Sequence, residues 1–280
     1  MKTDRIGINS ATLPGALHEK MDAVREAGFG ALVLSAKDLL AHPDGAAAAA
    51  RKVRASGVRV CAFQFLREMT GASDREVGYR IDAAKSMIEL AASVGCRLLI
   101  VSSSTVPTAI ADPEALARNL AVLGTLATPY GIRIGYEALA WGRWVSEYPD
   151  AWRVVQMANR HNVGLVIDSF QILMRQTSLD LLADIPADRI FLAQLSDCSF
   201  DFVTEIDEFV EISRHERRFP GEGVHGGLIS DLVARLRGKG YAGDYTLEVF
   251  NDENLRADLP AVIARAQASV QWLADKVAAA

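Results

Sequence analysis

The feature that most constrains the fold is a regular alternation of short apolar runs, typical of strands, with longer segments of helical periodicity. The predicted strands are residues 5–9, 31–34, 58–65, 97–101, 133–137, 163–168, 190–194 and 245–248. They are apolar almost throughout, as expected when both faces of a parallel sheet are covered. Eight strand–helix pairs with short connections predict an α/β fold, a closed (β/α)8 TIM barrel, and the 280 residues fit one such domain, 1–280.

The helical segments follow the strands with one interruption. The predicted helices are residues 14–26, 45–54, 113–128, 150–160, 179–183, 228–237 and 260–276, with a further long one between Ser73 and Gly95. The segment 196–223, between the seventh strand and its helix, is too long for an ordinary loop. Because long loops in compact domains are usually functional, we expect this segment to contribute to a site.

The charge balance and the cysteines exclude several classes of protein. The formal net charge of −5 and the isoelectric point near 5.6 give no basic surface, so neither nucleic acid nor a membrane is an expected partner. No apolar run reaches the roughly 18 residues of a membrane span. The N-terminus lacks the apolar core of a signal peptide, so a cytoplasmic protein is expected. Cys61, Cys96 and Cys198 show no CxxC spacing and are expected to be buried, reduced thiols.

Four consecutive predicted strands end in a side chain that carries oxygen. These side chains are Glu137, Asp168, Gln194 and Glu248. In a parallel barrel the carboxyl ends of the strands open onto one mouth, where active sites lie, so the four should share one volume. Three neighbouring carboxylates raise one another's pKa, and a divalent cation relieves this conflict; oxygen ligands alone favour Mg²⁺ or Mn²⁺. The alternative is that the acids form ion pairs at the rim with Arg217 or Arg143.

Longer motifs surround these strand ends. They are residues 136–143 (YEALAWGR), 168–170 (DSF), 194–197 (QLSD), 213–215 (SRH), Arg217, 219–221 (FPG) and 247–252 (LEVFND). Together they resemble the motifs of bacterial 3-dehydroshikimate dehydratases, which are xylose isomerase-like barrels of the sugar phosphate isomerase/epimerase superfamily. The similarity covers nearly the whole chain, and the combination of motifs is more specific than any one of them.

The resemblance implies a divalent-metal-dependent dehydratase that converts 3-dehydroshikimate, or a close cyclic hydroxy-keto acid, to protocatechuate by loss of water. In that family the residues matching Glu137, Asp168, Gln194 and Glu248 bind the metal, so Mg²⁺, Mn²⁺ or Co²⁺ is the expected cofactor. A cation at the ketone would stabilise the enolate that forms when a neighbouring proton is removed. The partner is then a small carboxylated cyclic or sugar-like molecule. Barrels of this class often pair as homodimers, and no stretch of this sequence marks an interface.

The resemblance also implies which other side chains reach the substrate. The expected substrate-binding residues are Gln64, Arg67, Ser104, Ser213, Arg217 and Phe250. Arg67 and Arg217 match family arginines, whose forked hydrogen bonds suit a carboxylate. The expected catalytic residues are Glu137, Gln171, His215 and Arg217. An aromatic mouth, or else core or lid packing, is expected from Trp141, Trp144, Phe170 and Phe200.

One position departs from the family pattern. Family members place a proton-abstracting histidine three residues after the aspartate of the sixth strand, and this chain has Gln171 there. An amide cannot accept that proton at neutral pH. Three alternatives stay open: another base such as His215 acts, the reaction is a ketose isomerisation or epimerisation with Glu137 and Glu248 as opposing acid and base, or the barrel binds ligands without turnover. Glu222, where the family often has glutamine, is expected to add a charge beside the site.

Overall fold

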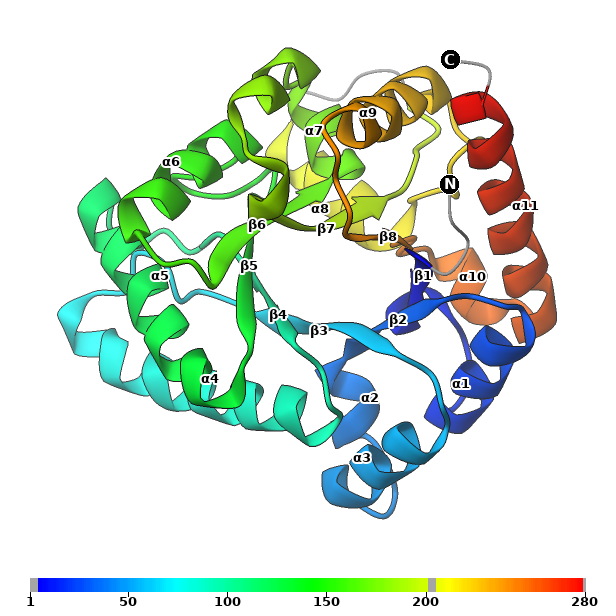
Figure 1. The fold of residues 1–280 in the computed structure, drawn as a ribbon, viewed down its shortest axis with the longest axis horizontal. Helices are drawn as coiled ribbons and strands as arrows, with labels where there is room; N and C mark the ends of the chain where they lie inside the picture. Colours follow the sequence, from blue (N-terminus) through cyan, green and yellow to red (C-terminus); the bar gives the residue numbers. More distant parts are fainter. Residues whose placement is uncertain (1–4, 201–204, 279–280) are drawn as a thin grey trace.

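Eight parallel strands close into one barrel in the computed structural model, which describes residues 5–200 and 205–278. Neighbours in sequence are neighbours in the barrel, and β8 pairs with β1 to close it (Figure 1). The strands are β1 Ile6–Asn9, β2 Ala31–Ser35, β3 Val60–Leu66, β4 Leu98–Ser102, β5 Arg133–Glu137, β6 Val163–Asp168, β7 Ile190–Leu195 and β8 Asp244–Leu247. The predicted closed α/β barrel is confirmed, and no predicted strand end differs from the observed one by more than two residues.

Apolar side chains fill the inside of the barrel below the mouth. They are Val33, Ala62, Leu98, Ile100, Val166, Phe191 and Leu192. Arg133 begins β5 at the opposite end of the barrel, and its guanidinium lies 4.4 Å from the centre of the Phe191 ring. Because the interior is packed, the polar side chains at the carboxyl ends of the strands face only the mouth.

A layer of helices surrounds the strands and buries their outer faces (Figure 1). These helices are α1 Leu17–Glu26, α3 Ala46–Ala55, α4 Asp74–Ser93, α5 Pro113–Ala127, α6 Tyr148–Ala158, α9 Gly226–Gly238 and α11 Leu259–Ala278. The start of α5 follows from local chemistry, since the Asp112 carboxylate accepts the Glu114 N–H at 3.0 Å and Pro113 occupies the first turn, where no N–H is needed. Its buried residues recur at the three- and four-residue spacing of a helix face.

Four short helices near the mouth were not predicted from the sequence. They are α2 Ala36–Leu40, α7 Ser169–Arg175, α8 Ile206–His215 and α10 Asp252–Arg256. Three of these have at most seven residues, which is too short for an apolar periodicity to be read. Their signal is the capping residue instead, because the side chains of Ser35, Asp168 and Asn251 each accept an N–H of the first turn.

Two predicted helices need correction. The first begins at Leu17 rather than at residue 14, because Ser10–Thr12 forms a 3-10 turn and Gly15 takes a φ of +91°, which a right-handed helix excludes. The helix predicted at residues 179–183 is the 3-10 helix Leu179–Asp184. It ends just before Pro186, and proline disfavours the α conformation of the residue that precedes it.

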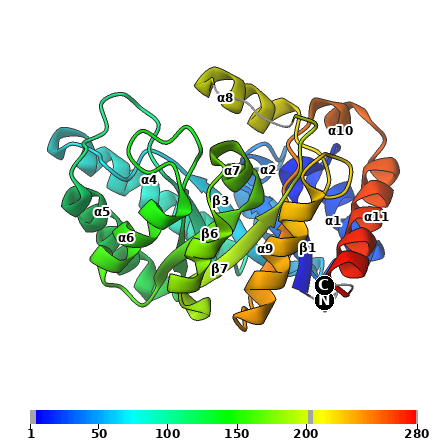
Figure 2. The ribbon, with the colours of Figure 1, turned by 90° about the horizontal axis from the view of Figure 1, so that it is seen from above.

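The predicted long loop, residues 196–223, contains the helix α8, and its residues 201–204 lie outside the described part of the chain. Figure 2 shows α8 and α10 on the same side of the barrel, above the strands. The fully buried Asp197 carboxylate accepts N–H groups from Cys198, Gly221 and His225. An antiparallel bridge also joins Asp197 to Arg218. These contacts fix the path by which the chain returns from α8 to α9.

In the part of the chain that the structure describes, no helix combines the length and the apolar character needed to cross a membrane. The three cysteines are free, as predicted, but Cys61 is only partly buried. Burial raises the pKa of the Cys96 thiol to about 12, so that thiol stays protonated and unreactive near neutral pH.

Replacing Asp197 by alanine should lower the free energy of unfolding by about 2–4 kcal/mol, because buried backbone N–H groups lose a charged acceptor. Urea unfolding followed by circular dichroism measures this change. Asp275→Ala, at an exposed position of α11, is the control and should change the free energy of unfolding by less than about 0.5 kcal/mol. Equal effects of the two substitutions would show that Asp197 does not stabilise the segment.

Candidate functional site

The sheet register places the four predicted metal ligands on one face of the barrel wall. Glu137 pairs with a residue two positions before Asp168. Asp168 pairs with Gln194, which in turn pairs with a residue two positions before Glu248. Side chains two residues apart share a face of a strand, and paired residues of neighbouring parallel strands point the same way. All four side chains therefore face the inside of the barrel near its mouth.

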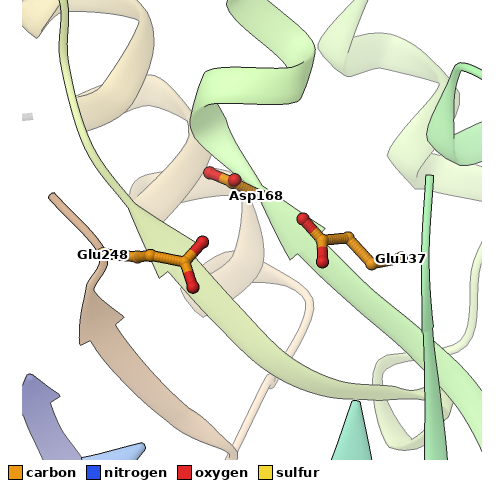
Figure 3. A group of neighbouring side chains, drawn as sticks. All are labelled: Glu137, Asp168 and Glu248. Carbon is orange, nitrogen blue, oxygen red and sulfur yellow. The ribbon is translucent and has the colours of Figure 1, made fainter. Parts of the chain in front are cut away.

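The carboxylates of Glu137, Asp168 and Glu248 point toward one another (Figure 3). One oxygen from each lies within 4.8 Å of the others, so one ion could contact all three. The exposed fractions are 1% for Glu137, 2% for Asp168 and 0% for Glu248, which removes these acids from bulk water. Closeness and burial together make this group a candidate metal centre.

Neighbouring groups hold each carboxylate in place while leaving oxygen atoms directed to the centre. Asp168 Oδ1 accepts the Phe170 N–H at 2.9 Å, which caps α7. Glu248 Oε1 accepts a hydrogen bond from Asn9 Nδ2 at 2.7 Å. Glu137 Oε2 is buried without a hydrogen-bond partner among the described residues. A buried oxygen of this kind costs free energy unless a donor or a cation reaches it.

Burial dominates the electrostatics of the three acids. It raises the pKa of the Glu137 carboxyl well above its ordinary value, and the charges of Glu248 and Asp168 raise it further. Burial also raises the pKa of Glu248, to about 7, although the positive charge of Arg217 opposes this shift. Ionising all three acids therefore costs free energy unless a cation in addition to Arg217 compensates their charges.

Arg217 supplies part of that compensation. Its Nη1 lies 2.9 Å from Asp168 Oδ2 and 3.3 Å from Glu248 Oε2. Arg143, the other arginine considered from the sequence, instead lies with its guanidinium 5.0 Å from the centre of the Trp144 ring. Three carboxylates and one guanidinium leave a formal charge of −2, so the ion pairs and a divalent cation are compatible.

Gln194 provides a neutral oxygen beside the acids. Its side chain is fully buried, and neither Oε1 nor Nε2 has a hydrogen-bond partner in the described chain. A cation bound at Oε1 would offset the cost of burying that atom. Carboxylate and amide oxygens without thiolate or imidazole suit hard ions, so the residues present fit Mg²⁺ or Mn²⁺.

Gln171 is fixed with its donor toward the acids. Its Oε1 accepts the Ala140 N–H at 2.7 Å, which determines the orientation of the amide. Its Nε2 then faces Glu137 Oε1 and Asp168 Oδ2, each at 3.4 Å. In this orientation Gln171 can donate hydrogen bonds to the carboxylates, but it cannot take a proton from a substrate.

A cavity of about 320 Å³ opens over the candidate metal centre. Most of the predicted substrate-binding residues line it, namely Gln64, Arg67, Ser213, Arg217 and Phe250. Ser104 is not among the lining residues, and its buried hydroxyl donates to the Thr70 carbonyl oxygen. The register is the reason, since Ser102, the last residue of β4, takes the place at the cavity wall beside Glu137.

Two other predicted features lie away from the acids. His215 ends α8, its Nδ1 lies 2.9 Å from Asp252 Oδ1, and its side chain is 46% exposed. Glu222 accepts two hydrogen bonds from Arg265, at 2.8 and 2.7 Å. The structure therefore does not bring His215 into the cavity, and the charge of Glu222 is neutralised by an arginine outside it.

Of the four predicted aromatic residues, only Trp141 lines the cavity. Phe170 is buried, whereas Trp144 and Phe200 are exposed at the surface. Phe65, which the sequence analysis did not single out, forms another part of the wall. The cavity thus has a charged floor and partly aromatic walls.

Ser35, Ser102 and Arg214 also line the cavity, and none of them was predicted as a site residue. Ser35 and Ser102 are the last residues of β2 and β4. The acids were predicted because each is an oxygen-bearing side chain at the end of a strand. Both serines share this feature, so the same pattern marks them as candidates. Arg214 lies on the exposed face of α8, and no sequence signal other than its motif marks it.

Mn²⁺ should raise the midpoint of thermal unfolding, and this rise should grow from about pH 5 to about pH 8. The reason is that the raised pKa values of Glu137 and Glu248 let protons compete for the oxygens that the ion needs. Without metal, the unfolded chain ionises these carboxyls at lower pH than the folded one, so stability should fall as the pH rises through about 7. Thermal unfolding with and without Mn²⁺ across this range measures both effects.

Glu248→Gln should remove most of the Mn²⁺ shift, whereas Glu89→Gln, at an exposed position of α4, should retain it. A shift of the same size at every pH would contradict a site built on these two carboxyls.

Comparisons with known proteins place the chain among barrels of this kind. The curated relatives include 3-dehydroshikimate dehydratases of Pseudomonas aeruginosa and Pseudomonas putida, which are 36% and 34% identical, each over 88% of this chain. The chain spans only 38% of the length of either relative. An inosose isomerase of Bacillus velezensis is 25% identical over 72% of this chain and 71% of its own length.

A solved structure with a similar fold is a xylose isomerase-like TIM barrel/4-hydroxyphenylpyruvate dioxygenase fusion protein. It has 31% sequence identity and a TM-score of 0.90, and the match covers 98% of this chain and 43% of that one. A family model described as xylose isomerase-like TIM barrel matches residues 21–276, which is most of the chain. The chain therefore belongs to the xylose isomerase-like TIM barrel family.

Proposed function

We propose that this barrel is a divalent-metal-dependent dehydratase that converts 3-dehydroshikimate, or a close cyclic hydroxy-keto acid, to protocatechuate. The observation that carries the proposal is a cavity with three buried carboxylates at its floor and arginines in its wall. The similarity to two proteins named 3-dehydroshikimate dehydratase supports the choice of substrate. Because the chain matches only 38% of their length, the activity remains a proposal for this chain.

In this proposal Glu137, Asp168, Gln194 and Glu248 hold Mg²⁺, Mn²⁺ or Co²⁺. When bound, the ion supplies a Lewis acid that stabilises negative charge developing on the substrate ketone. The orphaned Glu137 Oε2 and the unpartnered amide of Gln194 support this ligand set.

The wall of the cavity supplies recognition of the substrate carboxylate. Arg67 is exposed at the end of β3, and its guanidinium lies 5.2 Å from the centre of the Phe65 ring, so its N–H groups can point into the cavity. Arg214 lines the same cavity from α8. Forked hydrogen bonds from an arginine match the geometry of a carboxylate, so we assign the substrate carboxylate to this wall and the ketone to the floor.

The reaction removes a proton beside the ketone and a hydroxyl group from the ring, which together form one water molecule. The ring then enolises to give the phenol. Among the residues that line the cavity, only Glu137 and Glu248 can accept a proton near neutral pH. We therefore place proton removal on one of these carboxylates, through an oxygen that does not bind the ion, with Glu137 as the first candidate.

The same pair of carboxylates favours a second candidate, a ketose isomerase or epimerase. Removal of a proton next to a carbonyl is the first step of that reaction too, and Glu137 and Glu248 point toward each other across the centre (Figure 3). The inosose isomerase relative supports this alternative at lower identity. A third candidate, a barrel that binds metal and ligand without turnover, would show ligand stabilisation and no reaction.

Incubation with 3-dehydroshikimate and Mg²⁺, Mn²⁺ or Co²⁺ should produce the ultraviolet absorbance of a new aromatic ring. Glu137→Gln should lower kcat by about 10²–10⁴-fold, because the substitution removes a proton acceptor and a metal ligand. Glu89→Gln, an exposed carboxylate on α4, should leave turnover unchanged. Absence of turnover in metal-loaded protein would count against the dehydratase, and proton exchange of a ketose in D₂O, detected by NMR, would then favour the isomerase.

Gln171→His should raise dehydratase turnover by about tenfold or more, because an imidazole can accept the proton that the amide cannot. The pH dependence of kcat/KM should gain a step near the pKa of histidine, about 6.5. Gln171→Asn, which keeps an amide, is the matched control and should show neither effect. If the natural reaction is an isomerisation carried by the two glutamates, the histidine variant should give no gain with a ketose.

A further inference from the structure

Arg217 is held by hydrogen bonds and by contacts with two aromatic rings. Its Nε donates to the Ser213 carbonyl oxygen and its Nη2 to Ser213 Oγ, both at 3.0 Å. Its guanidinium lies between two rings, 4.3 Å from the centre of Phe170 and 5.1 Å from that of Phe250. Only 2% of the residue is exposed. The side chain therefore has one fixed position.

From that position Arg217 directs Nη1 at the acids. This nitrogen lies 2.9 Å from Asp168 Oδ2 and 3.3 Å from Glu248 Oε2, and also 3.4 Å from Ser196 Oγ. A substrate clamp would keep its paired N–H groups free for a ligand, as the exposed Arg67 does. Most N–H groups of Arg217 instead donate hydrogen bonds to protein atoms, and its guanidinium forms ion pairs with Asp168 and Glu248.

The charge of the centre depends on this one residue. Glu137, Asp168 and Glu248 contribute three negative charges, and among the described residues only Arg217 places a positive charge within ion-pair distance of them. With the arginine the formal charge is −2, which a doubly charged ion cancels. Without it the charge would be −3, and the buried acids would repel one another more strongly.

We infer that Arg217 is the built-in counter-cation of the metal centre. It holds Asp168 and Glu248 in place and sets the formal charge at −2, which matches a divalent ion. This inference rests on the metal centre of the proposed function. It assigns Arg217 a positioning role that acts through the two carboxylates, and it leaves recognition of the substrate carboxylate to Arg67 and Arg214.

The test compares Arg217→Met with Arg218→Met. Arg218 is the next residue, and its Nη1 pairs with Glu253 Oε2 at 2.6 Å, away from the three acids, so the control removes an equal charge without touching the centre. Metal-free Arg217→Met should unfold at a midpoint lower by about 5 °C or more than the control at about pH 8. Its Mn²⁺ dissociation constant, measured from the electron paramagnetic resonance of free Mn²⁺, should be tighter by about tenfold or more.

The preference of the site for a trivalent over a divalent ion depends on its charge, and a packing defect alone would not change this preference. Because Coulomb energy scales with the charge of the ion, Arg217→Met should tighten Tb³⁺ binding by a larger factor than Ca²⁺ binding, two ions of similar size. An unchanged Mn²⁺ affinity together with an unchanged Tb³⁺/Ca²⁺ preference would overturn the inference.

A charge-balanced variant covers the case in which Arg217→Met fails to fold. Arg217→Met combined with Glu248→Gln restores the formal charge of −2 and should regain stability relative to the single variant. If Arg217→Lys, which keeps the positive charge, and the charge-balanced variant are both as unstable as Arg217→Met, packing rather than charge explains the arginine and the inference is wrong.

Failure of the proposed function has a different outcome. Wild-type protein that binds Mn²⁺ but does not turn over 3-dehydroshikimate would refute the dehydratase and leave the effect of Arg217 on metal affinity measurable. Wild-type protein that binds no divalent ion would refute the metal centre itself and, with it, the counter-cation role.

Discussion

The chemistry of this barrel depends on how three carboxylates stay charged in a place that water hardly reaches. Burial alone would protonate them, as the raised pKa values of Glu137 and Glu248 indicate. Hydrogen bonds from Asn9 and Gln171 help, and the guanidinium of Arg217 cancels one charge. The remaining two charges are the physical reason to expect a divalent cation, because a buried acid without compensation costs several kcal/mol.

The fold prepares this site with few residues. Four neighbouring strands end in register, so that their last polar side chains share one face of the wall. Residues 168–171 then perform three tasks in one turn: Asp168 Oδ2 faces the centre, Asp168 Oδ1 caps α7, and Gln171 returns one turn later to contact Glu137. A change in that turn would disturb both α7 and the candidate metal centre.

Periodicity and strand ends were enough to predict the barrel and the converging acids, because both follow from local sequence. Residues that reach the site through long-range contacts were harder to place. Ser104 was expected at the wall, but the sheet register gives that place to Ser102. His215 was predicted from its motif, and the structure shows that its ring, at the end of α8, instead pairs with Asp252 at the start of α10. The role of Arg217 depends on two rings and a serine from three separate segments, and a linear pattern does not contain that information.

Gln171, at the position where the family resemblance implies a histidine, limits which residues can accept a proton but does not exclude the proposed chemistry. With the amide fixed by Ala140, the acceptors left in the cavity wall are the carboxylates of Glu137 and Glu248. Dehydration of a hydroxy ketone and isomerisation of a ketose both begin with removal of a proton beside a carbonyl. The carboxylates at the floor of the cavity could therefore catalyse either reaction. The residues of the wall determine which substrate would bind. Arg67 and Arg214 line that wall, and in our proposal they bind a carboxylate that a simple ketose lacks, which is why the dehydratase is the stronger of the two proposals.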